Sequence, residues 1–138
     1  MPSVLIVDDE PDIRAVLERL LTREAMEVRL AGTGAEGLAK FEQEPADVVI
    51  TDIIMPDMDG IQFIKALRQR KVPTRIIAIS GGGNVAAVGY RPQAISTTAY
   101  LAAAEVAGAD CVITKPFERD ELIGKVRELC ERSRLVSG

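Results

Sequence analysis

Hydrophobic residues recur along the chain in short runs, which alternate with longer segments of mixed character. The runs are rich in valine and isoleucine, and they cover residues 3–8, 27–31, 46–51, 75–80 and 111–114. In the longer segments, apolar residues recur every three or four positions, at 11–24, 34–43, 60–70, roughly 93–107 and 118–132. The first pattern is typical of β-strands and the second of amphipathic helices. The sequence therefore predicts a strand followed by a helix, five times over.

Some of the predicted strands are apolar at successive positions and not only at every second one. The runs VLIV at 4–7 and VVI at 48–50 leave no polar face. Strands of this kind fit a parallel sheet that helices cover on both sides. Pro11, Thr33 and Gly60 add helix-start signals to the first three predicted helices. We therefore expect a doubly wound α/β fold.

Length and composition set the expected number of domains. The chain has 138 residues, of which 47% are hydrophobic and 28% charged, as is typical of one soluble domain with its own core. No linker, repeat or low-complexity tract divides it, so we expect a single domain over 1–138. The last predicted helix ends near Arg132 and only SRLVSG follows, which predicts no output domain in this chain. A domain excised from a longer protein would look the same.

Charge, cysteine content and hydropathy disfavour several partners and compartments. The net charge of −4 argues against direct binding of nucleic acid. Cys111 and Cys130 are too few for a zinc site or a disulfide framework, and their apolar surroundings predict reduced residues in or near the core. The N-terminus lacks the basic region of a signal peptide, and no apolar run is long enough to span a membrane. We expect a cytoplasmic protein.

Carboxylates, a hydroxyl and a lysine follow the predicted strands. Because ligands of open parallel sheets bind at the carboxyl ends of the strands, these side chains are expected to meet at one edge of the sheet. They are Asp8, Asp9 and Glu10 after the first strand, Asp52 after the third, Ser80 at the end of the fourth and Lys115 after the fifth.

Each of these residues also has an ordinary structural interpretation. Asp8 and Asp9 are suited to cap the helix that begins near Pro11, and Asp52 and Ser80 are suited to turns. As a set, however, the carboxylates repel one another, and this raises the pKa of at least one of them unless a cation lies between them. Mg²⁺ binds through one or two carboxylates, water and phosphate oxygens. The acids therefore predict a Mg²⁺ site.

Four motifs resemble one family, the receiver domain of two-component response regulators, and in particular the chemotaxis regulators. They are VDDE at 7–10, TDIIMPDMDG at 51–60, AIS at 78–80 and TKPF at 114–117. They stand in the order and at the strand ends that are typical of the family, and the resemblance covers essentially the whole chain. It implies a flavodoxin-like (βα)5 fold with a five-stranded parallel sheet of order 2-1-3-4-5.

The resemblance also implies a role for each motif residue. It makes Asp52 the acceptor of a phosphoryl group. It makes Asp9 a direct Mg²⁺ ligand, with Asp8 acting largely through water and the backbone carbonyl of Ile54 as a further ligand. Ser80 and Lys115 would contact the phosphoryl oxygens. This arrangement suits phosphoryl transfer, in which the protein mainly aligns the reactants and neutralises charge.

The partners that the resemblance implies are a donor and a reader of the phosphoryl group. The donor is a sensor histidine kinase or a histidine phosphotransfer protein, and the chain has no histidine of its own to carry the group. The reader is a downstream protein, and the chain is a monomer or weak dimer. The domain is not an enzyme, although it assists its own phosphorylation and slow dephosphorylation. Two alternatives stay open, a phosphorelay intermediate and the excised receiver of a longer transcriptional regulator.

Two other classes share parts of the pattern. A flavodoxin-like flavin protein would place hydroxyls and backbone amides, and not VDDE, after the first strand. A phosphatase with an aspartyl-phosphate intermediate usually has a second acid two residues after the acceptor, where Ile54 stands. The colour of the purified protein and its turnover of phosphomonoesters separate both classes from a receiver.

The sequence departs from the family pattern in two places. Receivers typically carry an aromatic residue three positions before the lysine, where this chain has Val112. Valine has no ring to swing, so the usual coupling through that ring is not expected here. The span from Ser80 to Lys115 is also longer than in compact receivers, and the excess lies at 81–96.

Overall fold

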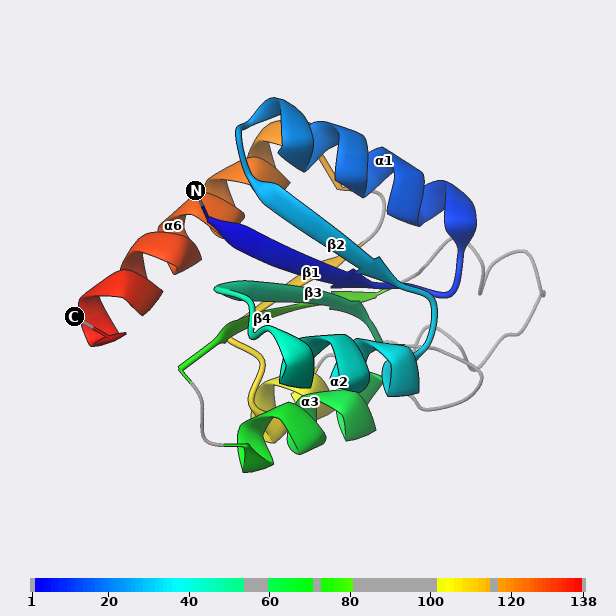
Figure 1. Cartoon of the computed structure of the whole chain (residues 1–138), viewed down its shortest axis with the longest axis vertical. Coiled ribbons are helices and arrows are strands. Elements are labelled where there is room, and N and C mark those ends of the chain that lie inside the picture. The colour runs from blue at the N-terminus through cyan, green and yellow to red at the C-terminus, as the bar shows by residue number, and fades with distance from the viewer. Residues whose placement is uncertain (1, 54–59, 71–72, 81–101, 115–116, 138) are drawn as a thin grey trace.

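Figure 1 shows the computed structural model of the chain, which describes residues 2–53, 60–70, 73–80, 102–114 and 117–137; of residues 80 and 132–137 only the backbone is described. The strands are β1 (Ser3–Val7), β2 (Glu27–Ala31), β3 (Val48–Asp52), β4 (Arg75–Ser80) and β5 (Cys111–Thr114). The helices are α1 (Pro11–Arg23), α2 (Gly34–Gln43), α3 (Gly60–Gln69) and α6 (Arg119–Ser137), and residues 102–107 are also helical.

The observed boundaries of the strands and helices agree with the predicted boundaries to within two residues, with one exception. The last helix was expected to end near Arg132, and that prediction was wrong because α6 continues to Ser137. The segment between these residues contains neither proline nor glycine, so no residue in it stops a helix. Residues 93–101 of the predicted fourth helix lie outside the described part of the chain.

The sheet has five parallel strands in the order β2-β1-β3-β4-β5, as the resemblance implied (Figure 1). Strand β3 is in the middle, between β1 and β4. Ser3 and Asp47 join the starts of β1 and β3, since the Ser3 N–H donates to the Asp47 carboxylate at 2.9 Å. The Asp47 N–H donates to the Ser3 carbonyl at 3.0 Å.

Helices cover both faces of the sheet, which divides the core into two clusters. In Figure 1, α1 and α6 lie on one face, and α2 and α3 lie on the other. Val4 and Ile6 of β1 belong to the cluster that includes residues of α1 and α6, whereas Leu5 and Val7 belong to the cluster under α2 and α3. All four side chains are fully buried, and this confirms the prediction that the strand has no polar face.

The two cysteines lie as their apolar context predicted. Cys130 is buried in the cluster beneath α1 and α6, and Cys111 is half-buried against the same cluster. Both are reduced cysteines, and burial raises the pKa of the Cys111 thiol. Val112 is partly buried against the cluster on the opposite face, where it packs as an ordinary core residue.

The start of α2 is capped by its own side chains. Thr33 is the N-cap residue, and its hydroxyl accepts the Glu36 N–H at 3.0 Å. The Glu36 carboxylate in turn accepts the Gly32 N–H at 2.7 Å. This backbone hydrogen bond, with help from the charge of Lys40, lowers the pKa of Glu36. The Thr33 hydroxyl satisfies an N–H group that a helix start leaves unpaired, and the Glu36 carboxylate holds the residue before the cap.

Arg68 joins three elements at the end of the sheet where β4 and β5 begin. Its guanidinium donates to the Gly108 carbonyl at 2.6 and 2.9 Å, to the Thr74 carbonyl at 2.7 Å and to the Asp110 carboxylate at 2.7 Å. Asp110 also accepts the Ile76 N–H at 2.8 Å. This Arg68 bridge holds the end of α3 against the starts of the last two strands.

Candidate functional site

The carboxyl ends of β1 and β3 bring two buried acids to the same edge of the sheet. Asp52 is the last residue of β3, and Asp8 directly follows β1. The side chains are almost entirely buried, with 4% of Asp52 and 2% of Asp8 exposed. The register pairs Val7 with Thr51, so the two strands reach this edge together. The prediction that Asp8 and Asp52 meet at one edge is confirmed.

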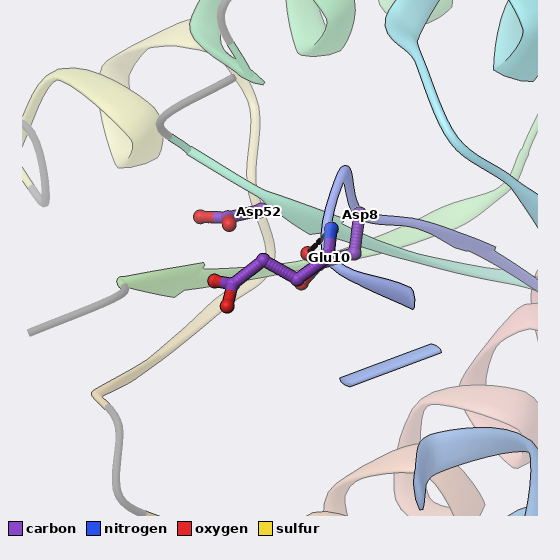
Figure 2. A group of neighbouring side chains, drawn as sticks. All are labelled: Asp8, Glu10 and Asp52. Carbon is purple, nitrogen blue, oxygen red and sulfur yellow. Dashed lines mark hydrogen bonds between the residues drawn. The ribbon is translucent and has the colours of Figure 1, made fainter. Parts of the chain in front are cut away.

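A third acid, Glu10, completes a cluster with them. One carboxylate oxygen from each of Asp8, Glu10 and Asp52 lies within 4.8 Å of the other two. Figure 2 shows this acid cluster, with the Glu10 carboxylate reaching toward Asp52 from the turn after β1. From the sequence, Glu10 was expected at this edge, but no role was predicted for it. The family motif assigns a role only to the acid pair Asp8 and Asp9.

The turn that carries Asp8 and Glu10 is held by hydrogen bonds on both sides. The Glu10 N–H donates to Asp8 Oδ1 at 2.9 Å, as the dashed line in Figure 2 marks. The Arg14 guanidinium donates to the Asp8 carbonyl at 2.6 Å, and the Asp8 N–H donates to the Ala31 carbonyl at 3.1 Å. Glu10 is the N-cap residue of α1, but its side chain makes no capping hydrogen bond. Its carboxylate therefore extends toward Asp52.

Asp9 is exposed and is not a member of the acid cluster. The resemblance makes it a direct Mg²⁺ ligand, and that role stays a prediction. Ser80 ends β4, and its backbone lies opposite Thr114 of β5, one step beyond the pairing of Ile79 with Asp52. The side chain of Ser80, and all of Ile54 and Lys115, lie outside the described part of the chain, as do residues 81–96.

The backbone at the end of β3 is held from three directions. The Thr51 hydroxyl donates to the Asp52 carbonyl at 2.9 Å, and the Ile53 N–H donates to the Ile79 carbonyl of β4 at 3.1 Å. The Gly60 N–H, at the start of α3, donates to the Ile53 carbonyl at 2.6 Å. The sequence predicted Gly60 only as a helix start, since nothing in a linear pattern places it against β3.

The acid cluster has the donor set that a hard divalent cation prefers. Each of its members offers carboxylate oxygen, and Mg²⁺ takes oxygen ligands and keeps several waters. Like charges this close repel one another, and a bound cation removes that cost. The residues at this edge therefore fit the Mg²⁺ that the sequence predicted.

Among the described residues, no helix is long and apolar enough to cross a membrane.

Comparison with known proteins gives a consistent set of relatives. The family model of the response regulator receiver domain matches residues 4–127. The transcriptional regulatory protein TrcR of Mycobacterium tuberculosis is 32% identical over 130 residues, which cover 94% of this chain and 46% of TrcR. The alkaline phosphatase synthesis transcriptional regulatory protein PhoP of Bacillus subtilis is 31% identical over 135 residues, which cover 98% of this chain and 51% of PhoP. The chain thus spans about half the length of these relatives.

Solved structures agree in fold over nearly the full chain. A response regulator receiver domain protein from Clostridium thermocellum has a TM-score of 0.77 and 25% identity, and the match covers 99% of both chains. A CheY-like receiver domain protein from Methanospirillum hungatei has a TM-score of 0.80 and 28% identity, and the match covers 97% of both. With the motifs, the strand order and the acids at the strand ends, these matches show that the chain belongs to the response regulator receiver domain family.

Proposed function

We propose that the chain accepts a phosphoryl group on Asp52 and thereby switches a protein partner in two-component signal transduction. The observation that carries this proposal is the position of Asp52, which is buried at the end of the central strand beside Asp8 and Glu10. A carboxylate is already anionic and needs no base to activate it as an acceptor. Strand β3 holds the Asp52 backbone and thereby fixes the direction from which the Asp52 carboxylate attacks the phosphorus of a donor.

Mg²⁺ is the cofactor that the proposed reaction needs. Asp8 and Asp52 would hold it from the acid cluster, and the resemblance adds Asp9 and the carbonyl of Ile54. When bound, Mg²⁺ supplies positive charge that offsets the negative charge of the phosphoryl oxygens. Ser80 ends β4 and Lys115 follows β5 in the sequence, and we assign the other phosphoryl oxygens to their hydroxyl and ammonium groups.

The phosphoryl donor is a separate protein in this proposal. The chain contains no histidine and cannot carry a phosphohistidine of its own, and a histidine kinase or a phosphotransfer protein is the proposed donor. The reader is a downstream protein in the cytoplasm, and the chain itself only assists its own phosphorylation and slow dephosphorylation. TrcR and PhoP are transcriptional regulatory proteins of about twice the matched length, which favours the receiver of a longer regulator over a phosphorelay intermediate.

The test is labelling by a small acyl phosphate. Acetyl phosphate with Mg²⁺ should add one phosphoryl group to the wild-type chain, visible by intact mass, and Asp52→Asn should abolish it. Asp12→Asn is the matched control, because it removes the same charge from an exposed position in the first turn of α1. Full labelling of Asp52→Asn would place the acceptor elsewhere.

A further inference from the structure

Gly60 packs against the backbone of the proposed acceptor. It is the first residue of α3 and is buried. A methyl group at Gly60 would lie 2.2 Å from the carbonyl oxygen of Asp52, 2.6 Å from Cα of Ile53 and 3.0 Å from the carbonyl carbon of Asp52. All three neighbours are backbone atoms, so none of them can rotate away as a flexible side chain would. Only glycine allows α3 to approach β3 this closely.

The same contact includes hydrogen bonds that fix the backbone of Asp52 and Ile53. The Gly60 N–H donates to the Ile53 carbonyl at 2.6 Å, and the Thr51 hydroxyl donates to the Asp52 carbonyl at 2.9 Å. The Ile53 N–H donates to β4 at 3.1 Å. Because Asp52 carries its carboxylate on this backbone, a shift of the peptide group moves the carboxylate as well.

We propose that Gly60 is a positioning residue for phosphoryl transfer, which acts by letting the start of α3 hold the Asp52 backbone in the geometry for in-line attack. The proposal rests on the proposed function of Asp52 as the acceptor. Gly60 itself touches no reacting atom. Its effect comes from the close approach of two backbones that are separated by residues 54–59 of the chain.

The size of the effect follows from the contact distances. Moving the Asp52 carbonyl from 2.2 Å to an ordinary contact of 3.4 Å requires a displacement of about 1.2 Å. A misplacement of about 1 Å costs a reaction roughly 100-fold in rate when alignment carries the catalysis. The affinity for a small donor should stay nearly unchanged, since Gly60 does not contact the donor. The loss should therefore appear in the maximal rate of labelling.

Two other glycines supply matched controls for the substitution Gly60→Ala. A methyl group at Gly37 would lie 2.8 Å from Val7 Cγ2 and 3.1 Å from Phe63 Cε1, so Gly37→Ala strains the core through side chains alone. A methyl group at Gly124 would meet nothing within 4 Å. Gly37→Ala thus reports the effect of lost stability, and Gly124→Ala reports the effect of an added methyl group in a helix.

The experiment measures labelling by acetyl phosphate at saturating Mg²⁺, at a temperature where every variant is folded by circular dichroism. We expect Gly60→Ala to lower the maximal labelling rate about 100-fold, with the half-saturating donor concentration within twofold of wild type. Gly37→Ala and Gly124→Ala should label within about threefold of the wild-type rate. Wild-type labelling by Gly60→Ala, or an equal loss in Gly37→Ala, would overturn the proposal.

A second variant covers the case in which Gly60→Ala does not fold. Thr51→Val removes the buried hydroxyl that bonds the Asp52 carbonyl, keeps the shape of the side chain and introduces no clash. It should label at least threefold more slowly than wild type, and an unchanged rate would overturn the proposal.

The Asp52→Asn variant separates failure of the proposed function from failure of the role proposed for Gly60. If Asp52→Asn still labels, the proposed function fails; if it does not, while Gly60→Ala and Thr51→Val label normally, only the role of Gly60 fails.

Discussion

Replacing Glu10 by glutamine removes one negative charge from the acid cluster and keeps the size of the side chain. The cluster then holds two carboxylates, those of Asp8 and Asp52. The substitution should have opposite effects on two quantities. It should raise the stability of the metal-free protein, because it relieves repulsion, and it should weaken Mg²⁺ binding, because it removes a carboxylate that faces the cation.

The magnitudes follow from the spacing of the cluster. One carboxylate oxygen of each acid lies within 4.8 Å of the others, and two unit charges at that limit repel by about 3.5 kcal/mol at an effective dielectric constant near 20. Glu10 is partly exposed, so solvent screens the repulsion that its carboxylate adds to the folded state. Removing that charge should raise the unfolding free energy by about 1 kcal/mol. That gain corresponds to about 3 °C in melting temperature for a chain of this size. Loss of a carboxylate beside a bound metal typically weakens its affinity about 10-fold or more.

The assay combines thermal unfolding in EDTA with calorimetric titration of Mg²⁺. Asp12→Asn is again the control, since Asp12 is exposed and lies outside the cluster. Its Mg²⁺ affinity should stay within about twofold of wild type. Asp9→Asn and Asp8→Asn belong in the same series, because a direct ligand should cost more affinity than a residue that acts through water. The resemblance predicts the larger loss for Asp9.

Two results would refute the reasoning about Glu10. One is a Glu10→Gln variant that binds Mg²⁺ as tightly as wild type. The other is a metal-free Glu10→Gln variant that is no more stable than Asp12→Asn. Either result would mean that the Glu10 carboxylate does not face Asp8 and Asp52 in solution.

The remaining predictions concern stability. Arg68→Ala should lower the unfolding free energy by roughly 2–3 kcal/mol, because the Arg68 bridge bonds two backbone carbonyls and a carboxylate. Arg70→Ala, which breaks a pair with the exposed Glu42, should cost no more than about 1 kcal/mol in the same denaturant titration. Equal losses would contradict the difference between the acidic partners, since the Asp110 side chain is 20% exposed and that of Glu42 is 55% exposed. Because the folded-state pKa of Glu36 is lowered, its contribution is present above the ordinary value of 4.5 and is lost as the pH falls through the folded-state pKa. Glu36→Gln should therefore be less stable than wild type at pH 7, with a difference that shrinks in acid; a difference independent of pH would contradict this sign.

The hydrophobic pattern was enough to predict a doubly wound α/β fold and part of the site, whereas the strand order came from the resemblance of the motifs. Runs such as VLIV are buried on both faces, so their position in the chain indicates the strands directly. Asp8 and Asp52 could be placed together because parallel strands end at one edge of the sheet. The end of α6 was predicted too early, near Arg132, although residues 133–137 contain neither proline nor glycine.

Two features of the site depend on distances that no linear pattern contains. Glu10 joins the acid cluster because the turn after β1 directs its side chain toward Asp52, and a motif that assigns only the preceding acid pair does not reveal this direction. Gly60 contacts Asp52 across residues 54–59 through backbone atoms alone. A glycine before an amphipathic segment indicates a helix start equally well whether or not another backbone lies against it.

The order of the strands gives different parts of the sheet different resistance to local unfolding. Asp8 directly follows β1 and Asp52 ends β3, and both strands have hydrogen-bonded neighbours on both sides, whereas β5 is a strand of four residues at the edge of the described sheet, beside β4. Edge elements open at a lower free energy than central ones, because fewer bonds must break. Strand β5 can therefore open and re-form while Asp8 and Asp52 stay fixed at the centre of the sheet. A partner that binds near β5 would shift that opening equilibrium without displacing Asp52.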